Sequence, residues 1–365
     1  MMTVLSGTGL YLPPETLTND ELVGSFNAYV DQYNQQHAAD IACGKREALG
    51  YSSAEFIAKA SGVESRHVID KQGILDVATM RPQIQEFDEQ GRSIQAQMAV
   101  AAAQKAMEAA HIGADEIQMV IASCSGFQRC YPAIAIEVQA GLGIEGFAYD
   151  MNVACSSVTF ALFNAVNAIK AGAADSVLVV NPEVFTSQVD FRDRKSHFLF
   201  GDAATAFIVQ RKDKCRYEHA FEIVDYEIKT LFSANIENNL GITNAVDTSR
   251  PYFIQDGNKV FKEVIKLTTE TIKNQLTRLE LEGLKRLWLH QANSNMIRLI
   301  SNKLLGHNPN ELEAPQPIKY CGNTSSCGAM IAFHENHQDM VAGDLGLLAT
   351  FGAGYSLGSV VLRKA

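Results

Sequence analysis

The sequence lacks three features that would each have indicated a class of protein. It has no uninterrupted apolar stretch of about 18 residues, so a membrane-spanning helix is not expected. Residues 1–7 contain no basic segment followed by a long apolar core, so we expect no secretory signal. Basic residues number 31 against 41 acidic ones. The net charge of −10 argues against nucleic acid as a partner, because phosphate binding needs a basic face.

Cysteine usage argues against both a disulfide framework and a metal centre. Seven cysteines are an odd number in a chain of 365 residues, which favours reduced thiols in the cytoplasm. Cys124 and Cys130 share a spacing with Cys321 and Cys327, but neither pair has the short spacing of zinc ligands. We expect these four to be structural thiols near the functional site, and we expect no metal.

What the chain does contain is one pattern of helices and strands that occurs twice. A helical stretch at residues 94–110 precedes a buried strand at 116–123. A second helical stretch at 261–279 precedes a strand at 284–290 in the same way. Helices that alternate with β-branched apolar runs indicate largely parallel sheets covered by helices. The sequence therefore predicts a duplicated α/β fold.

Length and composition are those of a globular enzyme with two lobes, since the chain exceeds a typical single core. We place the first half at residues 1–212 and the second at 213–365, because charged residues near 212–216 interrupt the pattern. The first half carries an insertion of roughly two dozen residues at about 22–52, which includes a predicted helix. The insertion is either a tolerated surface segment or a cap over a substrate mouth, and the sequence leaves both open.

Cys155 lies where a strand-like run meets a helix, in the sequence Asp150-Met-Asn-Val-Ala-Cys-Ser-Ser-Val. We expect the unpaired N–H groups of the helix start to lower the pKa of this thiol and favour the nucleophilic thiolate. An isolated cysteine there would more often be a small buried residue. The functional interpretation is favoured by His290, in Trp-Leu-His-Gln-Ala-Asn, and Asn323, in Cys-Gly-Asn-Thr-Ser-Ser.

Further sequence blocks extend this pattern, in a fixed order, over nearly the whole chain. With the three residues above, they resemble the β-ketoacyl-acyl carrier protein synthase III family of the thiolase superfamily. The blocks are Gly7-Thr-Gly-Leu-Tyr-Leu-Pro, Ser61-Gly-Val-Glu-Ser-Arg, Phe200-Gly-Asp-Ala-Ala-Thr-Ala, Gly257-Asn-Lys-Val-Phe-Lys and Phe351-Gly-Ala-Gly-Tyr-Ser-Leu-Gly. The resemblance implies a thiolase fold, in which duplicated α/β halves arrange stacked mixed sheets and helices in layers.

The resemblance implies a decarboxylative Claisen condensation that uses coenzyme A thioesters as substrates and no cofactor. Cys155 would hold the acyl primer as a thioester. Malonyl-acyl carrier protein would then lose carbon dioxide, with His290 and Asn323 donating hydrogen bonds to the enolate oxygen. A second oxyanion hole would use the backbone N–H groups of Cys155 and Gly354. Elongating synthases of the superfamily pair the cysteine with two histidines, and thiolases use a second cysteine as a base. The Cys-His-Asn set differs from both.

Residues for substrate and partner binding also follow from the resemblance. The family holds the coenzyme A adenine with a tryptophan and an arginine, whereas the matching positions here are Phe56 and Ala60. Arg194 remains a candidate to stack on the adenine or to pair with phosphate. Tyr131 matches a phenylalanine at the family's homodimer interface, beside the partner's acyl pocket. The other residues assigned to substrate binding are Asn258, Phe261, Ala292 and Asn293.

A row of lysines predicts a docking surface for acyl carrier protein, which is itself acidic. Lys259, Lys262, Lys266 and Lys273 recur at helical intervals and share one face of the predicted helix. Arg298 and Lys303 are candidates to extend this patch. The alternative is an ordinary solvated face, since Glu263 and Glu270 lie among the lysines.

Related reactions on the same fold remain alternatives. Polyketide synthesis is one, and head-to-head acyl condensation or acyl transfer to oxygen or nitrogen is another. The latter need a carboxylate base near Cys155, and Glu137 is the nearest candidate in sequence, although its helical surroundings favour a structural role. An inactive scaffold subunit is a further alternative, which the intact triad opposes. The sequence does not determine the chain length of the primer.

Overall fold

A nine-stranded sheet forms the centre of the molecule, in the order β11-β12-β13-β8-β1-β7-β6-β4-β5. The structure is a computed structural model that describes residues 1–85, 87–217, 219–241 and 253–365. The strands of the sheet are β1 (Thr3–Tyr11), β4 (Met119–Ser123), β5 (Phe147–Met151), β6 (Ser176–Glu183), β7 (Ala203–Arg211), β8 (Phe221–Ser233), β11 (Leu284–Leu289), β12 (Leu345–Gly352) and β13 (Gly354–Lys364).

The sheet consists of two parts that repeat one topology. In the first part β4 pairs in parallel with β6, β6 antiparallel with β7, and β7 antiparallel with β1. In the second part β11, β12, β13 and β8 repeat these relations in the same order. The parts meet where Val4 and Leu5 of β1 pair with Glu222 and Phe221 of β8. This repeat supports the proposal of two halves, whose boundary we place between β7 and β8.

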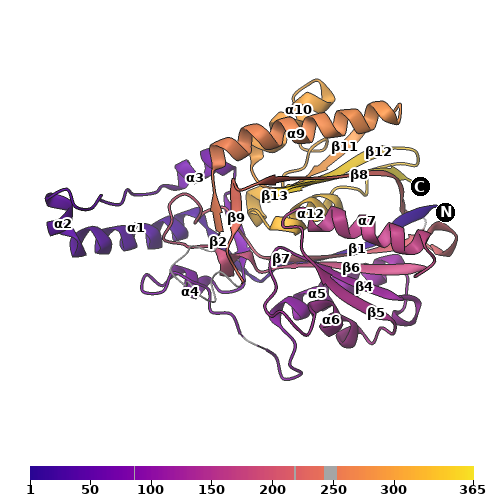
Figure 1. Cartoon of the computed structure of the whole chain (residues 1–365), viewed down its shortest axis with the longest axis horizontal. Coiled ribbons are helices and arrows are strands. Elements are labelled where there is room, and N and C mark those ends of the chain that lie inside the picture. The colour runs from indigo at the N-terminus through magenta and orange to yellow at the C-terminus, as the bar shows by residue number, and fades with distance from the viewer. Residues whose placement is uncertain (86, 218, 242–252) are drawn as a thin grey trace.

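Three layers of helices enclose the two parts of the sheet, as Figure 1 shows. The central layer lies between the two parts of the sheet, and the outer layers cover their far faces. The central helices are α7 (Ser157–Lys170) and α12 (Gly328–Glu335). The outer helices are α5 (Ile94–Ala110) and α6 (Ile134–Leu142) on one side and α9 (Gly257–Arg278) and α10 (Ser294–Leu305) on the other. No helix among the described residues is long and apolar enough to cross a bilayer.

Small residues set the spacing between these layers. Gly7 and Gly9 of β1 face the alanine-rich helix α5, where a Cβ would lie 2.4 Å from the carbonyl oxygen of Ala106 or 2.0 Å from that of Ala102. Every residue of β6 is buried, as expected for a strand covered on both faces. The helix before β11 begins at Gly257 and includes the whole lysine row. Asp256 caps it by accepting the N–H of Lys259.

The insertion forms an arm that projects from the body (Figure 1). Its long helix α1 (Asn19–Gln36) begins at a capping box made by Thr18 and Glu21, and a shorter helix α2 (Ala38–Ala42) follows. The returning chain is held to α1 by two hydrogen bonds. The side-chain amide of Asn34 donates to the carbonyl of Leu49, and its oxygen accepts the N–H of Leu49. The projection supports a surface segment rather than a cap. The remaining elements are α3 (Ala54–Ser61), α4 (Lys71–Leu75), α11 (Ile318–Cys321), β2 (Glu15–Thr18), β3 (Ser65–Val68), β9 (Ile236–Asn238) and β10 (Phe253–Gln255).

Candidate active site

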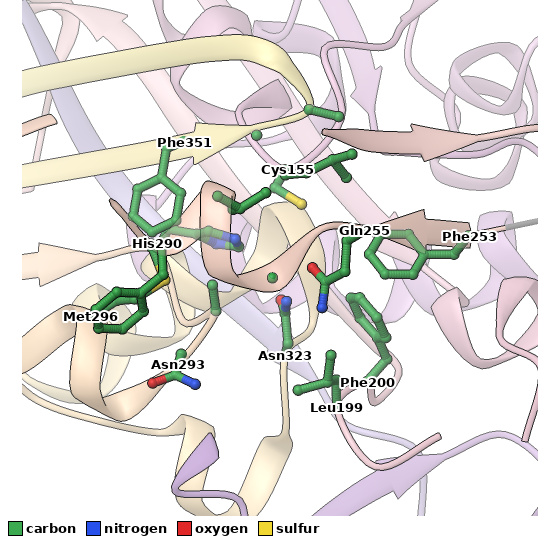
Figure 2. Close-up of a pocket in the computed structure, with 17 residues that line it drawn as sticks. Cys155, Leu199, Phe200, Phe253, Gln255, His290, Asn293, Met296, Asn323 and Phe351 are labelled. Atoms are coloured by element: carbon green, nitrogen blue, oxygen red, sulfur yellow. The ribbon is translucent and has the colours of Figure 1, made fainter. Parts of the chain in front are cut away.

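Cys155, His290 and Asn323 line one cavity, although they lie far apart in the sequence. Figure 2 shows their side chains pointing into the same space. Cys155 comes from the turn before α7, His290 follows β11, and Asn323 follows α11, so both parts of the fold contribute. The rest of the lining is mainly apolar and includes Leu199, Phe200, Ile236, Phe253, Phe261 and Phe351.

A strained turn presents Cys155 to the cavity. Ala154 has a φ of 49°, a left-handed conformation that residues with side chains rarely adopt. The N–H of Ser156 closes the turn by donating to the carbonyl of Val153 at 3.1 Å. Gly352 fits directly against this turn, because a Cβ on it would lie 2.9 Å from the backbone nitrogen of Cys155. A larger residue at 352 would displace the nucleophile.

His290 is held at the end of β11 by its backbone and by ring packing. Its N–H donates to the carbonyl of Ala349 at 2.8 Å, and its ring meets that of Phe351 edge-on at 4.8 Å. Burial lowers the pKa of His290 to about 3, so the imidazole is neutral near pH 7. Its Nδ1 has no hydrogen-bond partner among the described residues. A neutral ring in this position can donate through one nitrogen and accept through the other.

Asn323 is fixed at both its backbone and its side chain. Its N–H donates to the carbonyl of Leu199 at 2.8 Å, and its carbonyl accepts from Gly201 at 3.2 Å. The side-chain oxygen accepts the N–H of Ser325 at 2.9 Å. The amide nitrogen is therefore the group that Asn323 can offer to a substrate, and it can only donate.

The predicted lowering of the Cys155 pKa is wrong. Burial raises the pKa of this thiol to about 12, and the negative charge of Glu183 adds to the effect. A hydrogen bond from the hydroxyl of Ser325 to the sulfur, at 3.3 Å, acts in the opposite direction. Helix α7 does begin just after Cys155, as predicted, but burial outweighs the influence of its N-terminus. The resting nucleophile is a thiol.

Gly354, the expected second oxyanion donor, does not line the cavity that contains Cys155. Gly354 opens β13 and borders a different hollow, together with Asn152, Ala154 and Phe232. Gly352 and Ala353 line the cavity beside Cys155 instead. The chain reverses between β12 and β13 at this point, so a shift of one residue changes which backbone group faces the cavity. We therefore move the proposed donor from Gly354 to Ala353.

Of the four other residues assigned to substrate binding, Phe261, Ala292 and Asn293 line the cavity, while Asn258 does not. Asn258 is exposed in the first turn of α9, beside the cavity-lining Gly257. Asn293 also has a structural role, because its side chain caps α10 through the N–H of Asn295 at 2.8 Å. Its assignment to substrate stays a proposal.

Phe56 and Arg194, the two candidates for adenine binding, lie against each other outside the cavity lining. The guanidinium carbon of Arg194 is 4.3 Å from the centre of the Phe56 ring. Its Nε donates to the carbonyl of Tyr51 at 2.8 Å, which links it to the returning chain of the arm. An adenine ring would have to displace this contact or stack on its outer side.

The predicted interaction surfaces lie outside the cavity. Tyr131 is 84% exposed, and its place beside a partner subunit stays a prediction. Lys259, Lys262 and Lys266 are exposed on α9. Lys259 pairs with Asp256 at 3.0 Å, and Lys266 lies 3.9 Å from Glu270. Exposed ion pairs of this kind contribute little free energy.

Sequence reasoning missed Ser325, which contacts the sulfur, and Glu183, a fully buried carboxylate whose charge acts on Cys155. A charged residue at the end of a strand of mainly apolar residues was the available signal for Glu183. Glu137 is structural as expected, since it pairs with Arg129 at 2.6 Å and accepts the N–H of Ser93.

Cys124, Cys321 and Cys327 are buried, whereas Cys130 is exposed, contrary to its prediction as a structural thiol. Among the described residues no cluster of His, Cys, Asp and Glu could hold a metal.

Comparisons with known proteins bear on the family and the fold of the chain. Sequence models of 3-oxoacyl-(acyl carrier protein) synthase III match residues 149–230 and, for its C-terminal part, 275–364. A β-ketodecanoyl-(acyl carrier protein) synthase of Pseudomonas aeruginosa is 50% identical over 347 residues, which are 93% of this chain and 99% of the relative. A β-ketoacyl-(acyl carrier protein) synthase III of Xanthomonas campestris is 29% identical over 98% of this chain and 97% of its own. The crystal structure of 3-oxoacyl-(acyl carrier protein) synthase III from Aquifex aeolicus, 26% identical, superposes with a TM-score of 0.77 over 99% of each chain, which confirms the predicted fold.

Proposed function

Because this chain belongs to the β-ketoacyl-acyl carrier protein synthase III family and is an acyl-transferring condensing enzyme, we propose that it condenses an acyl-coenzyme A primer with malonyl-acyl carrier protein. The observation that carries the proposal is the convergence of Cys155, His290 and Asn323 in one cavity. The products would be carbon dioxide and a β-ketoacyl chain for fatty acid biosynthesis. We place the reaction in the cytoplasm, which the seven free thiols support.

The first step transfers the primer to Cys155. The sulfur attacks the thioester carbonyl of acyl-coenzyme A while the neutral imidazole of His290 accepts the thiol proton. Such a base is needed because the pKa of the thiol is about 12. The tetrahedral oxyanion would accept hydrogen bonds from the N–H groups of Cys155 and Ala353. Its collapse breaks the carbon–sulfur bond to coenzyme A, whose sulfur leaves with the proton.

The second step generates the carbon nucleophile. Malonyl-acyl carrier protein loses carbon dioxide, and the bonding electrons pass to the thioester as an enolate. His290 and the amide nitrogen of Asn323 would donate to its oxygen, and a neutral imidazole and an amide supply this hydrogen bonding without a proton transfer. The enolate carbon then attacks the acyl group on Cys155, and the cysteine sulfur leaves as a thiolate that takes up a proton from water to restore the thiol.

We propose a medium-chain primer of eight carbons. The 50% identical relative is named for a β-ketodecanoyl product, and decarboxylative condensation adds two carbons to its primer. An apolar lining that includes Phe200, Phe253 and Ile236 supports an aliphatic chain rather than a short acetyl group. The primer would therefore be octanoyl-coenzyme A.

The partners that we propose are acyl carrier protein and a second copy of this chain. The exposed lysines of α9 supply positive charge beside the cavity-lining residues Gly257 and Phe261, where an acidic carrier would deliver its thioester. The exposed ring of Tyr131 supports a homodimer in which this residue borders the partner's acyl pocket.

Intact mass spectrometry with a mixture of acyl-coenzyme A thioesters, from acetyl to palmitoyl, tests the primer directly. At equal concentrations the octanoyl adduct should dominate the acylated protein. Dominance of the acetyl adduct would contradict the medium-chain proposal while leaving the condensation intact. Formation of product from two acyl thioesters without release of carbon dioxide would instead indicate head-to-head condensation.

A further inference from the structure

A buried carboxylate binds the residue next to Ser325, which contacts the nucleophile, and has no part in the reaction described so far. Glu183 ends β6, is fully buried, and accepts four hydrogen bonds from two serines. Ser125 donates its N–H at 3.0 Å and its hydroxyl at 2.6 Å. Ser326 donates its N–H at 3.2 Å and its hydroxyl at 2.6 Å. One carboxylate thus joins a loop of the first half to a loop of the second.

The loop that Ser326 anchors carries two groups of the site. Asn323 lies three residues earlier, and Ser325 donates its hydroxyl to the Cys155 sulfur at 3.3 Å. Ser325 has a φ of 49°, and a strained residue of this kind persists only where its surroundings hold it. Ser326, the next residue, donates two hydrogen bonds to Glu183 and so fixes the backbone directly beside Ser325.

A carboxylate suits this position because it is an acceptor at both oxygens, and all four neighbouring groups are donors. Its negative charge also acts on three thiols, namely Cys155, Cys124 and Cys327, and makes each harder to ionise. Asp150 is a further carboxylate that acts on Cys124. His290 is neutral and does not offset these charges. Burial raises the pKa of Glu183 to about 6, so the group is charged above that pH.

We propose that Glu183 is a positioning residue for the condensation. It fixes the loop that holds Asn323 and Ser325 over Cys155, and its charge adds to the effect of burial on the Cys155 thiol. This inference rests on the proposed role of Cys155 as the acyl-carrying nucleophile.

The charge effect is tested by the rate at which iodoacetamide alkylates Cys155, followed by peptide mass mapping from pH 6 to pH 10. Glu183→Gln removes the charge but keeps the size of the side chain, so the thiol should ionise about one pH unit lower. Because a thiolate of lower pKa is also a weaker nucleophile, alkylation at pH 8 should rise only about threefold. The result that overturns the proposal is an unchanged or slower alkylation.

Asp202→Asn is the matched control for loss of a buried carboxylate. Asp202 is also fully buried, with a pKa raised to about 6, and accepts hydrogen bonds from Thr186 and Ile69. Its charge is not among those that act on Cys155, so alkylation should keep the wild-type pH profile. If Glu183→Gln does not fold, Glu183→Asp, which withdraws the charge by one methylene, should shift the profile in the same direction by less. An unshifted profile in Glu183→Asp would overturn the proposal equally.

The positioning effect is tested by Ser326→Ala, which keeps the charge and removes a 2.6 Å hydrogen bond to it. Release of carbon dioxide from malonyl-acyl carrier protein should fall about tenfold, while the acylation rate of Cys155 changes little. Ser301→Ala removes a buried hydroxyl that the described residues leave without a partner, and it should leave both rates unchanged. Equal carbon dioxide release in the two serine variants would exclude the positioning role. If the proposed function itself is wrong, the result will be different: acylation will persist in Cys155→Ala.

Discussion

At the scale of single residues, the site combines a thiol that resists ionisation with an imidazole that stays neutral. Burial raises the pKa of Cys155 to about 12 and lowers that of His290 to about 3. The resting pair is therefore a thiol and a neutral ring rather than a thiolate and an imidazolium. In the proposed mechanism, acylation requires proton transfer to His290, whereas stabilisation of the enolate needs only neutral donors.

His290→Ala and Asn323→Ala should each lower the decarboxylation rate by about two to three orders of magnitude, the usual effect of losing one oxyanion donor. Asn323→Ala should spare acylation of Cys155, because the amide of Asn323 is proposed to serve the enolate alone. His290→Ala should slow acylation as well, since His290 also accepts the thiol proton. Labelled carbon dioxide release and intact mass measure the two steps separately. A loss of acylation in Asn323→Ala as large as its loss of decarboxylation would contradict the assigned role.

The residue-level predictions failed where burial or a long-range contact decides the outcome. The pattern around Cys155 placed the sulfur at the start of a helix, but the sequence did not show that the thiol is buried. The partners of Glu183 lie 58 and 143 residues away, so no local pattern could reveal them. Cys155, His290 and Asn323 could be proposed from the sequence because the residues around each of them carry the family's pattern, and the structure places all three in the lining of one cavity.

At the scale of secondary structure elements, the site depends on tight turns between strands and helices. The reversal from β12 to β13 lies against the turn that carries Cys155, and the sequence Gly-Ala-Gly did not reveal which residue faces the cavity. The repeated helix and strand pattern was predictable, because apolar periodicity is a local property. The projection of the arm was not, because it depends on contacts between α1 and the returning chain.

Gly352→Ala should reduce acylation of Cys155 by at least about tenfold, because the added Cβ would lie 2.9 Å from the Cys155 nitrogen and push the turn aside. Gly24→Ala in α1, where a Cβ meets nothing within 4 Å, should leave acylation unchanged and slightly stabilise the helix. Stopped acylation assays and thermal unfolding compare the two variants. Wild-type acylation in Gly352→Ala would show that the turn tolerates movement.

At the scale of the whole molecule, charge distribution matters more than net charge. The chain is acidic overall, yet the exposed face of α9 presents a row of lysines. A local basic surface can steer an acidic partner even on an acidic protein, and salt weakens that attraction.

Lys262→Glu combined with Lys266→Glu should raise the KM for malonyl-acyl carrier protein several-fold, with a smaller effect at high salt. Turnover of malonyl-coenzyme A as a surrogate should barely change. The control combines Lys45→Glu with Lys214→Glu, which makes the same change in net charge at exposed positions away from α9. A KM that rises equally in both double variants would attribute the effect to net charge rather than to a docking surface.

Buried imidazoles should make the fold sensitive to acid. His197 stacks on Phe26 at 4.5 Å, and burial lowers its pKa to about 3, well below that of an exposed histidine near 6.5. Between these values the unfolded chain binds a proton that the folded chain does not, so the stabilisation present above pH 6.5 is lost as pH falls towards 3. The free energy of unfolding should therefore decrease less between pH 7 and pH 5 in His197→Phe than in wild type. The exposed His219→Phe should retain the wild-type dependence, and parallel curves for wild type and His197→Phe would contradict the account.

The most direct test of the central claim follows one acyl group through a single turnover. The enzyme is loaded with octanoyl-coenzyme A, malonyl-acyl carrier protein is added, and the peptide containing Cys155 and the carrier protein are weighed over time. The account predicts that an octanoyl group appears on Cys155, then disappears as a β-ketodecanoyl group appears on the carrier, and that Cys155→Ala shows neither. An octanoyl group on another residue, or one that malonyl-acyl carrier protein fails to discharge, would contradict it.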